Sequence, residues 1–336
     1  MTSPPYSRII GIGRALPRRV LTNEDLCQIV DTSDEWIRSR TGISERHIVS
    51  DGESTATLAV EAAGDALRRA AIDPAVVDLV IVATSTPDFA VFPSTACLVQ
   101  DQLGLARAAA FDLSAACSGF VYALITASQF IAGGAYRTIL VIGSDTLTRY
   151  LDFEDRSTCV LFGDGAGAVV LTSSERPGGL LSFMMGADGS GAPYMNVPAG
   201  GSRAPLTADT LAGHENKIHM NGREVYRFST TVPSSALKQA ACAADIRVED
   251  LDLVVAHQAN IRILQTMSKN LGLPQERFFS NLERYGNTSA ASVPLALCDA
   301  STAGRIGPGA LIGLVGFGAG LTWATAIWSW QGLIGD

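Results

Sequence analysis

The chain is poor in charged residues and lacks the features that mark nucleic-acid binding or metal chemistry. Charged side chains make up 17% of its 336 residues, and the formal net charge is −8. Proteins that bind nucleic acids present clustered basic charge to the phosphates, so this acidic balance argues against a nucleic-acid partner. The chain has only four histidines, and no cysteine or histidine spacing in it is typical of a metal site. We therefore expect no metal.

The chain also lacks a disulfide pattern and a secretion signal. Its six cysteines are scattered, without a Cys-x-x-Cys pair. In a chain of this length, such cysteines indicate reduced thiols in a cytoplasmic protein. The segment Met1–Tyr6 has no basic stretch followed by an apolar core, so we expect no signal peptide. The cysteines are Cys27, Cys97, Cys117, Cys159, Cys242 and Cys298.

One segment without charge is long enough to cross a membrane. Ile306–Gly335 contains no charged residue, and about 20 apolar residues suffice to span a bilayer as a helix. However, the segment is broken in two by Gly309, Gly313, Gly316, Gly318 and Gly320. The pattern instead predicts two strands, Leu311–Val315 and Leu321–Trp330, joined by a glycine-rich turn. We therefore expect no membrane span.

Short apolar runs alternate with helical patterns along the chain, which is typical of an α/β fold. Two segments of the first half, Glu61–Ala71 and Gly119–Ala132, predict helices. The second is apolar almost all round, which indicates a buried helix, and Gly133-Gly134 ends it. The predicted strands of this half are Ile9–Ile12, Leu79–Ala83, Ala109–Leu113, Ile139–Ile142 and Ala168–Leu171.

The second half repeats the order of the first. Asp252–Ala256 matches Asp78–Ala83, and Leu311–Gly316 matches Ile139–Gly143. This pattern predicts an internal duplication with a long period, although two unrelated βαβ units could also look alike. The halves would be residues 1–176 and 177–336, and the polar run Asn196–Asn216 would form a long surface loop.

Cys117 is the strongest candidate nucleophile. It lies in a run of small residues between a predicted strand and the predicted helix Gly119–Ala132. At the start of a helix, unpaired amides and the helix dipole stabilise a thiolate and lower the pKa of the thiol. The other five cysteines lie within predicted elements, so we interpret them as structural.

His257 and Asn287 are the candidates for a second catalytic role. His257 follows the strand Asp252–Ala256, and open α/β sheets place their chemistry at the carboxyl ends of strands. Asn287 precedes a predicted helix, Val293–Leu297, and could merely cap it. Alternatively, an imidazole and an amide could donate hydrogen bonds to an enolate oxygen.

Three glycine-rich turns have different interpretations. Gly316–Gly320 follows a strand and could bind an oxyanion through its amides, or could be a plain hairpin turn. Gly163–Gly167 suggests a structural turn. Gly11-Ile12-Gly13 begins like a dinucleotide fingerprint, but Leu16 stands at its third glycine position, so we expect no nicotinamide cofactor.

Five motifs together resemble the β-ketoacyl-acyl-carrier-protein synthase III family, in matching order and spacing from Ile9 to Trp328. The resemblance implies an α/β thiolase fold, in which two βαβαβαββ halves form a five-layer αβαβα sandwich, and it implies a homodimer. The motifs are Asp31–Ile37 with Arg40–Ile43, Ala116–Gly119, His257–Asn260, Gly286–Ala290 and Gly316–Trp323.

The resemblance also implies a reaction that starts fatty-acid synthesis without a cofactor. Cys117 would take an acyl group from coenzyme A, with the amides of Cys117 and Ala319 as oxyanion hole. Malonyl-acyl-carrier protein would then lose CO₂, and His257 and Asn287 would stabilise the enolate. Attack on the acyl-cysteine would give a β-ketoacyl product.

The family's substrate contacts carry over to matching positions. Arg227, Arg262 and Lys269 would form a basic patch for the acidic carrier protein. Phe92 would reach across the dimer into the partner's acyl pocket. The implied coenzyme A contacts are Trp36 and Arg156 around the adenine, Thr32 nearby, Arg40 at the phosphates, and Asn260 and Gly222 at the pantetheine arm.

Three departures from the family pattern affect these contacts. Ser157 and Tyr226 replace a common glycine and phenylalanine, and the segment Thr86–Val91 is about one residue longer than is usual. Three alternatives stay open: a related acyltransferase or starter-selecting enzyme of specialised metabolism, a papain-like hydrolase with the same Cys, His and Asn order, and a non-catalytic binding protein.

Overall fold

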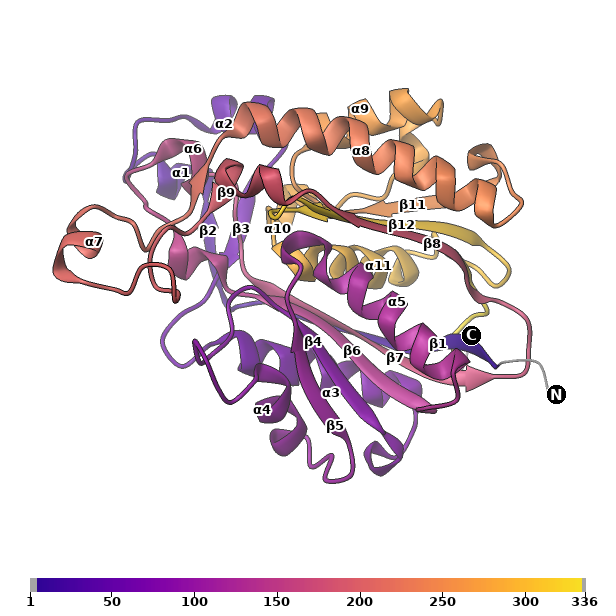
Figure 1. The fold of residues 1–336 in the computed structure, drawn as a ribbon. Helices are drawn as coiled ribbons and strands as arrows, with labels where there is room; N and C mark the ends of the chain where they lie inside the picture. The colour runs from indigo at the N-terminus through magenta and orange to yellow at the C-terminus, as the bar shows by residue number, and fades with distance from the viewer. Residues whose placement is uncertain (1–4, 334–336) are drawn as a thin grey trace.

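A computed structural model describes residues 5–333. Figure 1 shows two sheets separated by a central pair of helices, with further helices on the outer face of each sheet. The order of layers is helix, sheet, helix, sheet, helix. This arrangement confirms the predicted five-layer α/β sandwich.

The first sheet has five strands and contains the strands predicted for the first half. β4 pairs in parallel with β5 and β6, and β7 runs antiparallel to both β1 and β6. β4 and β6 are buried along their whole length, which explains why their sequences are continuous apolar runs. In sheet order the strands are β1 (Tyr6–Ala15), β7 (Gly165–Ser174), β6 (Thr138–Asp145), β4 (Leu79–Ala83) and β5 (Ala109–Leu113).

The second sheet repeats this plan with four strands. β11 and β12 are parallel, and β12, β13 and β8 are antiparallel neighbours. The predicted strand pair near the C-terminus is confirmed, and within residues 5–333 no helix is long and apolar enough to cross a membrane. In sheet order the strands are β11 (Leu253–Ala256), β12 (Leu311–Gly318), β13 (Thr322–Ser329) and β8 (Gly179–Ala187).

The two sheets differ at one edge. Where the first sheet has β5, the second has a single bridge between Phe278 and Val254. The last strand of the first sheet, β7, ends at Ser174, and the first strand of the second, β8, begins at Gly179. The division into residues 1–176 and 177–336 stays a prediction.

Two buried helices form the central layer. α5 (Gly119–Ala132) has the predicted bounds, and α11 (Ser292–Thr302) extends beyond the predicted Val293–Leu297. Their apolar side chains join both sheets in one core. Because α5 begins at the end of one sheet and α11 at the end of the other, the starts of both helices meet at the same place.

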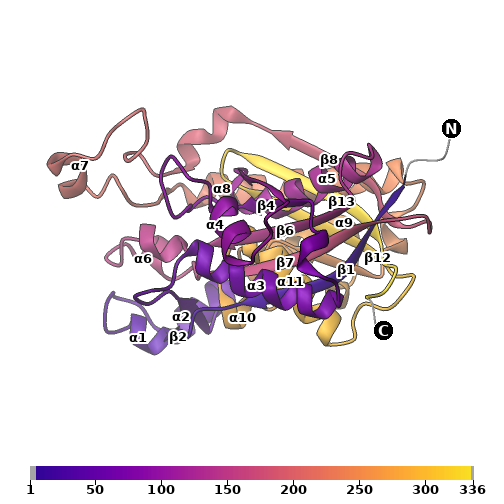
Figure 2. The same ribbon diagram turned by 90° about the horizontal axis from the view of Figure 1, so that it is seen from below.

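The outer helices cover the two sheets from opposite sides. α3 (Thr55–Ala70) and α4 (Thr95–Gln102) lie on the first sheet, as Figure 2 shows from below. α8 (Gly222–Ala243) and α9 (Ile261–Leu271) lie on the second. α3 starts six residues before the predicted Glu61, because Ser54 caps it.

The glycines of the Gly11-Ile12-Gly13 run have a packing role. A Cβ atom at Gly11 would lie 2.3 Å from the carbonyl oxygen of Ala66, and one at Gly13 would lie 2.2 Å from that of Ala62. Both glycines therefore allow β1 to approach α3 closely. The close packing of β1 on α3 therefore explains why this run looks like a dinucleotide fingerprint, and no bound nucleotide is needed to explain it.

Short elements surround the edge at which the strands end. The loop 197–207 and α7 project from the body at the left of Figure 1. The short elements are β2 (Arg19–Thr22), α1 (Asn23–Leu26), α2 (Asp34–Thr41), β3 (Glu45–Ile48), α6 (Arg156–Cys159), β9 (Met195–Asn196), α7 (Ala208–Ala212), β10 (His219–Met220) and α10 (Leu282–Tyr285). Single 3-10 turns are Pro74–Val76, Ala116–Ser118, Leu147–Tyr150, Gly189–Tyr194, Val248–Asp250, Gln275–Arg277 and Ser289–Ala291.

Candidate active site

Cys117 lies in a 3-10 turn directly before α5, as the sequence predicts. Its side chain is buried, and Ala116 before it has a left-handed backbone with φ of 47°. Gly318 of β12 packs against this turn: a Cβ atom there would lie 2.8 Å from the nitrogen of Cys117 and 3.1 Å from Sγ. The two halves of the chain therefore meet at the sulfur.

The expected low pKa of this thiol is wrong. Burial raises the pKa of the Cys117 thiol to about 12, although hydrogen bonds from the Ser289 hydroxyl and from the amides of Cys117 and Ala319 lower it. Removing the thiolate from water costs more than these donors return. Cys117 is therefore a thiol at rest, and its proton needs an acceptor during reaction.

His257 follows β11 and is fixed on two sides. Its amide donates to the carbonyl of Val315 at 2.7 Å, and its Nδ1 lies 2.6 Å from Oγ of Ser292 at the start of α11. The ring of Phe317 packs edge-on, with centroids 5.1 Å apart. Burial lowers the pKa of His257 to about 3, so the imidazole is neutral near pH 7. If Ser292 donates to Nδ1, Nε2 carries the hydrogen.

Asn287 lies between α10 and α11, and its main chain forms an isolated β-bridge with Phe162. Its amide donates to Leu161 at 2.8 Å, and its carbonyl accepts from Gly163 at 3.0 Å. Its Oδ1 accepts from the amide of Ser289 at 2.9 Å, which leaves the Nδ2 hydrogens for a ligand. The alternative that Asn287 caps α11 is wrong, because the cap position of that helix is Ala291.

One cavity of about 220 Å³ brings the three candidates together. Cys117 contributes to it from the first half of the chain, and His257 and Asn287 contribute from the second. Gly222 and Asn260 line the same cavity. The remaining lining residues are Leu161, Phe162, Met195, Met220, Val225, Tyr226, Ser229, Ala259, Ile263, Phe317 and Gly318.

A second cavity of about 470 Å³ also reaches Cys117. Ser85 and Thr86 form part of its lining, and Ala319 and Ser289 lie near the sulfur. Much of its wall comes from the segment predicted as a surface loop, through Val197, Ala199, Gly200, Gly201, Leu206 and Asn216. That loop therefore shapes a cavity beside the nucleophile as well as projecting from the surface.

The predicted oxyanion hole also has its two members together. The main-chain amides of Cys117 and Ala319 both lie close enough to Sγ to lower the pKa of the thiol. Ala319 follows β12, so the glycine-rich turn Gly316–Gly320 supplies one amide and the nucleophile turn supplies the other. Two amides directed at one position suit an oxygen that gains negative charge.

Trp36 and Arg156 lie together but leave no gap for a third ring. Cζ of Arg156 is 5.2 Å from the centroid of the Trp36 ring. A ring stacked between them at about 3.5 Å from each would require about 7 Å. An adenine sandwich therefore requires Arg156 to leave its contact with the carbonyl of Asp31, at 2.8 Å.

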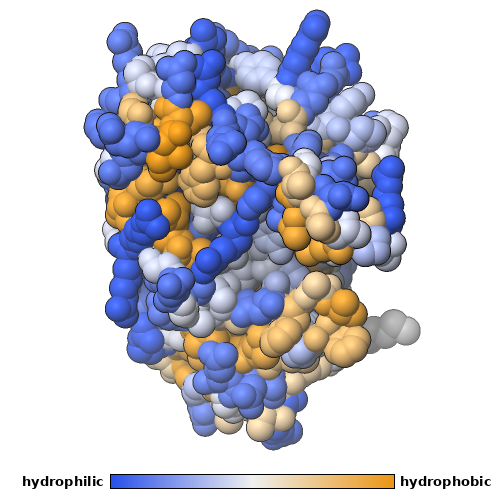
Figure 3. Space-filling model, turned by 90° about the vertical axis from the view of Figure 1, so that its left-hand side faces the viewer, coloured by the Kyte–Doolittle hydropathy of each residue, from blue (hydrophilic) through white to orange (hydrophobic). Residues whose placement is uncertain are grey.

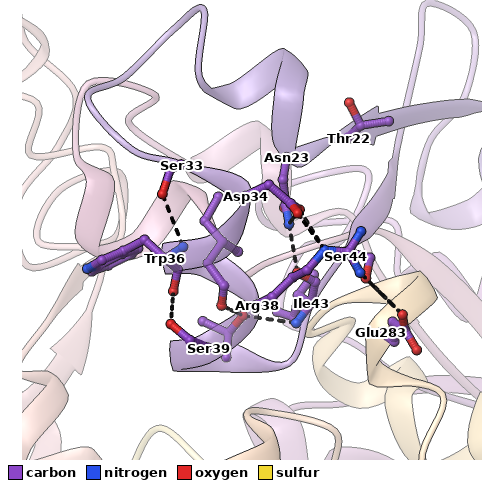
Figure 4. A network of polar contacts seen from close by, with 12 residues as sticks. Thr22, Asn23, Ser33, Asp34, Trp36, Arg38, Ser39, Ile43, Ser44 and Glu283 are labelled. Carbon is purple, nitrogen blue, oxygen red and sulfur yellow. Dashed lines mark hydrogen bonds and ion pairs between the residues drawn. The ribbon is translucent and has the colours of Figure 1, made fainter.

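A polar network fixes the helix that carries Trp36 (Figure 4). Nε of Arg38 donates to both carboxylate oxygens of Asp34 at 2.7 Å. The amide of Trp36 donates to Ser33, and Ser44 donates to Glu283 of α10 at 3.0 Å. In Figure 4 the indole points away from this network, so α2 holds the ring at a fixed position on the surface.

Two of the other predicted coenzyme contacts, Arg40 and Asn260, meet at the boundary between α2 and α9. Nδ2 of Asn260 donates to the carbonyl of Arg40 at 3.1 Å. Oγ1 of Thr32 is buried without a hydrogen-bond partner among the described residues. Gly222 begins α8. Figure 3 shows the face from which α7 projects, with a recess near its middle and apolar side chains on either side.

The three predicted basic residues are exposed on neighbouring outer helices. Arg227 lies on α8 and pairs with Glu224 at 2.6 Å. Arg262 and Lys269 lie on α9, and Arg262 donates to the carbonyl of Ser39 at 2.8 Å. The α8 residue Tyr226, which lines the cavity of Cys117, bonds Thr266 of α9 at 3.1 Å.

Phe92 lies on the loop between β4 and α4 and does not line either cavity beside Cys117. Its side chain is 79% exposed, and that of Val91 is 81% exposed. Phe89 on the same loop is half exposed. An apolar loop tip of this kind suits burial against another surface.

Sequence reasoning missed three polar residues around the site. Ser289 lies 3.4 Å from Sγ of Cys117, Ser292 contacts His257, and Asp145 ends β6 beneath Ser289. The signals were present: the two serines lie in the run that contains Asn287, and Asp145 ends a parallel strand as His257 nearly does.

The buried neutral His257 predicts a pH dependence of stability. Its pKa falls from about 6.5 in the unfolded chain to about 3 in the folded chain, so the unfolded chain binds the proton more tightly. This stabilising contribution is complete above pH 6.5 and is lost as the pH falls. Between pH 7.5 and 5.5 we expect a loss of about 1 kcal/mol. Urea unfolding of His257→Asn should lack this loss, whereas the exposed control His219→Asn should retain it.

Two family models and many known proteins match this chain. The model of the 3-oxoacyl-acyl-carrier-protein synthase III matches residues 111–189, and that of its C-terminal part matches residues 242–330. A curated β-ketoacyl-acyl-carrier-protein synthase III of Natranaerobius thermophilus is 50% identical over 327 residues, covering 96% of this chain and 99% of that protein.

Solved structures of related enzymes have the same fold. The 3-oxoacyl-acyl-carrier-protein synthase III of Aquifex aeolicus is 45% identical with a TM-score of 0.88, covering 96% of this chain and all of that one. The priming β-ketosynthase of the R1128 polyketide pathway is 34% identical with a TM-score of 0.91, covering 98% of each chain. These similarities extend over nearly the whole chain.

Proposed function

The chain belongs to the 3-oxoacyl-acyl-carrier-protein synthase III family, and we propose that it joins an acyl primer from coenzyme A to malonyl-acyl-carrier protein. The protein is an acyltransferase of the condensing type. The product would be a β-ketoacyl-acyl-carrier protein, formed with loss of CO₂, which begins fatty-acid synthesis. The shared cavity of Cys117, His257 and Asn287 carries this proposal.

In the first step, Cys117 takes the acyl group. A bond forms between Sγ and the thioester carbon, the bond to the sulfur of coenzyme A breaks, and coenzyme A leaves. The carbonyl oxygen gains negative charge in between. The amides of Cys117 and Ala319 both lie close to Sγ, so they would stand beside that oxygen and stabilise it without reorganisation.

In the second step, the malonyl group loses CO₂ and leaves its electron pair as an enolate. Nε2–H of His257 and Nδ2–H of Asn287 would donate to the enolate oxygen. The hydroxyl of Ser292 bonds Nδ1 of His257, and the amide of Ser289 donates to Oδ1 of Asn287. These bonds would leave Nε2 and Nδ2 to donate to the substrate. The enolate carbon then attacks the acyl carbonyl, and Sγ of Cys117 leaves. Because both donors are neutral, neither would form a salt bridge with the malonyl carboxylate, and such a salt bridge would oppose the loss of CO₂.

The test is intact-protein mass spectrometry with a panel of acyl-coenzyme A thioesters, followed by CO₂ release from malonyl-acyl-carrier protein. We expect one acyl mass per chain and CO₂ release that depends on the carrier protein. A protein that gains no acyl mass from any thioester would contradict the proposal and favour the non-catalytic alternative. The thiolase fold already excludes the papain-like alternative.

The substrate contacts follow the family positions. Trp36 and Arg156 would hold the adenine after Arg156 moves, with Thr32 nearby, and Arg40 would meet the phosphates. Asn260 and Gly222 line the cavity of Cys117 and would hold the pantetheine arm. Tyr226 at the same cavity would narrow its entrance, because its hydroxyl is bonded to α9.

Arg262→Ala is expected to weaken use of the carrier protein more than use of coenzyme A. The residue is exposed on α9, where an acidic partner would meet it, together with Arg227 and Lys269. We expect the KM for malonyl-acyl-carrier protein to rise about fivefold, less at high salt, and the KM for acyl-coenzyme A to change less than twofold. Steady-state kinetics with both substrates measures this difference.

Arg305 offers a matched control for that variant. It is also an exposed arginine that donates to a main-chain carbonyl, that of Glu276, but it follows α11 and so does not belong to α8 or α9, which carry the patch. Arg305→Ala should leave both KM values unchanged. Equal changes of the carrier-protein KM in the two variants would contradict the proposed patch.

We also propose a cytoplasmic homodimer that uses no cofactor besides its substrates. The apolar side chain of Phe92 is exposed in this chain. It would insert into the partner subunit, beside the second cavity of that subunit. Each chain would act as two similar halves, residues 1–176 and 177–336. The second cavity would then receive the acyl chain of the primer.

One observation favours a second candidate, a starter-selecting enzyme of specialised metabolism. The priming β-ketosynthase of a polyketide pathway is similar along the whole chain. A cavity of about 470 Å³ beside Cys117 could take a primer larger than acetyl. Acylation of Cys117 without later CO₂ release from malonyl-acyl-carrier protein would favour a simple acyltransferase.

A further inference from the structure

Two turns from opposite halves of the chain pack against each other at the nucleophile. One is the turn of Cys117 before α5, and the other is the glycine-rich turn Gly316–Gly320 at the end of β12. A Cβ atom at Gly318 would lie 2.8 Å from the nitrogen of Cys117, and one at Gly316 would lie 2.8 Å from Cα of Ser118. The main chains of the two turns are therefore in direct contact, without room for a side chain at either glycine.

Two hydroxyl groups fasten these turns to each other. Oγ1 of Thr322, at the start of β13, lies 2.9 Å from the carbonyl oxygen of Ala319 and 3.0 Å from that of Ala115. Oγ of Ser118 lies 2.8 Å from Oγ1 of Thr322 and 2.6 Å from the same carbonyl oxygen of Ala115. Each hydroxyl has one hydrogen to donate. A hydrogen bond from Ser118 to Thr322 and another from Thr322 to Ala319 use both hydrogens and link the two turns.

The backbone at Ala116 needs such support. Its φ of 47° is left-handed, a conformation that an alanine keeps only where the surrounding structure holds it. The carbonyl of Ala115 and the amide of Cys117 belong to the two peptide groups that flank Ala116, so a fixed carbonyl helps to fix the amide. At Ala319 the bonded carbonyl and the amide flank one Cα atom, and the same argument applies.

We propose that Thr322 and Ser118 are positioning residues, which hold the amides of Cys117 and Ala319 where both can donate to the oxygen of a thioester under attack. Neither side chain lines the two cavities that reach Cys117, so neither touches the substrate there. They act through the main chain instead. The inference rests on the proposed acylation of Cys117 and adds two side chains that no step of that proposal uses.

The expected effect is on the rate of acylation and not on substrate binding. The thioester oxygen gains its negative charge only during the attack, so a misplaced amide weakens an interaction of the transition state alone. Such a change lowers the maximal rate and leaves the half-saturating concentration nearly unchanged. Iodoacetamide reacts with Cys117 at a CH₂ carbon, so no carbonyl oxygen gains charge. The rate of this alkylation therefore reports on the position and access of the sulfur.

Four variants test the proposal. Thr322→Val replaces the hydroxyl by a methyl group of similar shape, and Ser118→Ala removes the second hydroxyl. Thr322→Ser restores a hydroxyl at the first position. Thr325→Val is the matched control, because Thr325 also lies on β13 and donates to a carbonyl, that of Ala236 in α8 at 3.2 Å. Circular dichroism and thermal melting establish that each variant is folded.

The first readout is the rate of acyl mass gain in a single turnover, measured over a range of acyl-coenzyme A concentrations. We expect Thr322→Val to lower the maximal rate by a factor of about 10 to 100, since displacing one donor approaches the effect of losing it. Ser118→Ala should lower it by a smaller factor, because Thr322 can still bond Ala319. Thr322→Ser and Thr325→Val should stay within about threefold of the wild type, and every half-saturating concentration within about twofold.

The second readout is alkylation of Cys117 by iodoacetamide, followed by mass spectrometry of the peptide that contains it. The exposed Cys97 and Cys242 also react, so the peptide identifies the thiol. We expect all four variants to alkylate within about twofold of the wild type. If alkylation in Thr322→Val slows as much as acylation does, the substitution has displaced the sulfur itself, and the proposal is overturned.

The rescue variant separates the hydroxyl from the shape of the side chain. Acylation that is unchanged in folded Thr322→Val would overturn the proposal, as would a Thr322→Ser variant that is as slow as Thr322→Val. Where Thr322→Val does not fold, an unchanged maximal rate in folded Ser118→Ala overturns it. A wild type that gains no acyl mass would instead overturn the proposed function, and this inference with it.

Discussion

Replacement of Cys117 by alanine is expected to abolish formation of the acyl-enzyme. The variant loses the one thiol that lines both cavities, and with it the atom to which the amides of Cys117 and Ala319 lie close. We expect the rate of acyl mass gain to fall by at least about 10⁴-fold, because loss of a nucleophile removes the covalent route entirely. Intact-protein mass spectrometry after incubation with acyl-coenzyme A measures it.

Cys97→Ala is the control for this experiment. Cys97 is an exposed thiol, as is Cys242, and such thiols are where unspecific acylation would occur. Cys159 and Cys298 are buried but line neither cavity beside Cys117, so neither can meet a substrate there. The Cys97→Ala variant should acylate like the wild type. If the mass gain persists in Cys117→Ala and disappears in Cys97→Ala, the assignment of the nucleophile is wrong.

Elements with strong local signals were predicted with their actual bounds. β4, β5 and α5 match the predicted Leu79–Ala83, Ala109–Leu113 and Gly119–Ala132. Each is a short apolar run or a helix with a glycine stop, so its own sequence defines it. β8 was not predicted, because its residues alternate irregularly between buried and exposed along the strand. Its pairing with β13 fixes it as a strand, and that contact is distant in sequence.

The three candidates that share one cavity could be named from the sequence because each one lies beside a recognisable pattern. Cys117 precedes a helix, His257 follows a strand, and Asn287 lies in a run of small polar residues. Their electrostatic state could not be predicted. The pKa of the thiol depends on how completely distant segments cover it, and here this burial outweighs the helix start. Asp145 had a signal, because it ends a parallel strand, but its place beneath Ser289 results only from folding.

The coenzyme contacts show a further limit of sequence reasoning. The sequence places Trp36 and Arg156 at matching family positions, but it does not give the distance between them. In the structure they stack on each other, which closes the expected adenine site. In the proposed function, coenzyme A binding would therefore displace a cation–π contact worth about 1 kcal/mol. That cost is small compared with the contacts that a nucleotide can make.

Replacement of Asn287 by alanine is expected to slow CO₂ release while sparing acylation. The variant loses one of two hydrogen-bond donors to the enolate, which forms only after the acyl group is in place. Removal of one such donor costs about 10² to 10³ in rate. CO₂ release from labelled malonyl-acyl-carrier protein by enzyme that was acylated beforehand measures the loss, and acyl mass gain measures the step that should be spared.

Asn287→Asp separates the donor from the structural role of this side chain. Oδ1 of Asn287 accepts from the amide of Ser289, and an aspartate keeps that bond but removes the Nδ2 hydrogens. Both variants should lose CO₂ release. A defect in acylation that appears in Asn287→Ala alone would show that this side chain also positions Ser289 beside Cys117. Normal CO₂ release in both variants would contradict the role of Asn287 at the enolate, because the neutral His257 would then be a sufficient donor by itself.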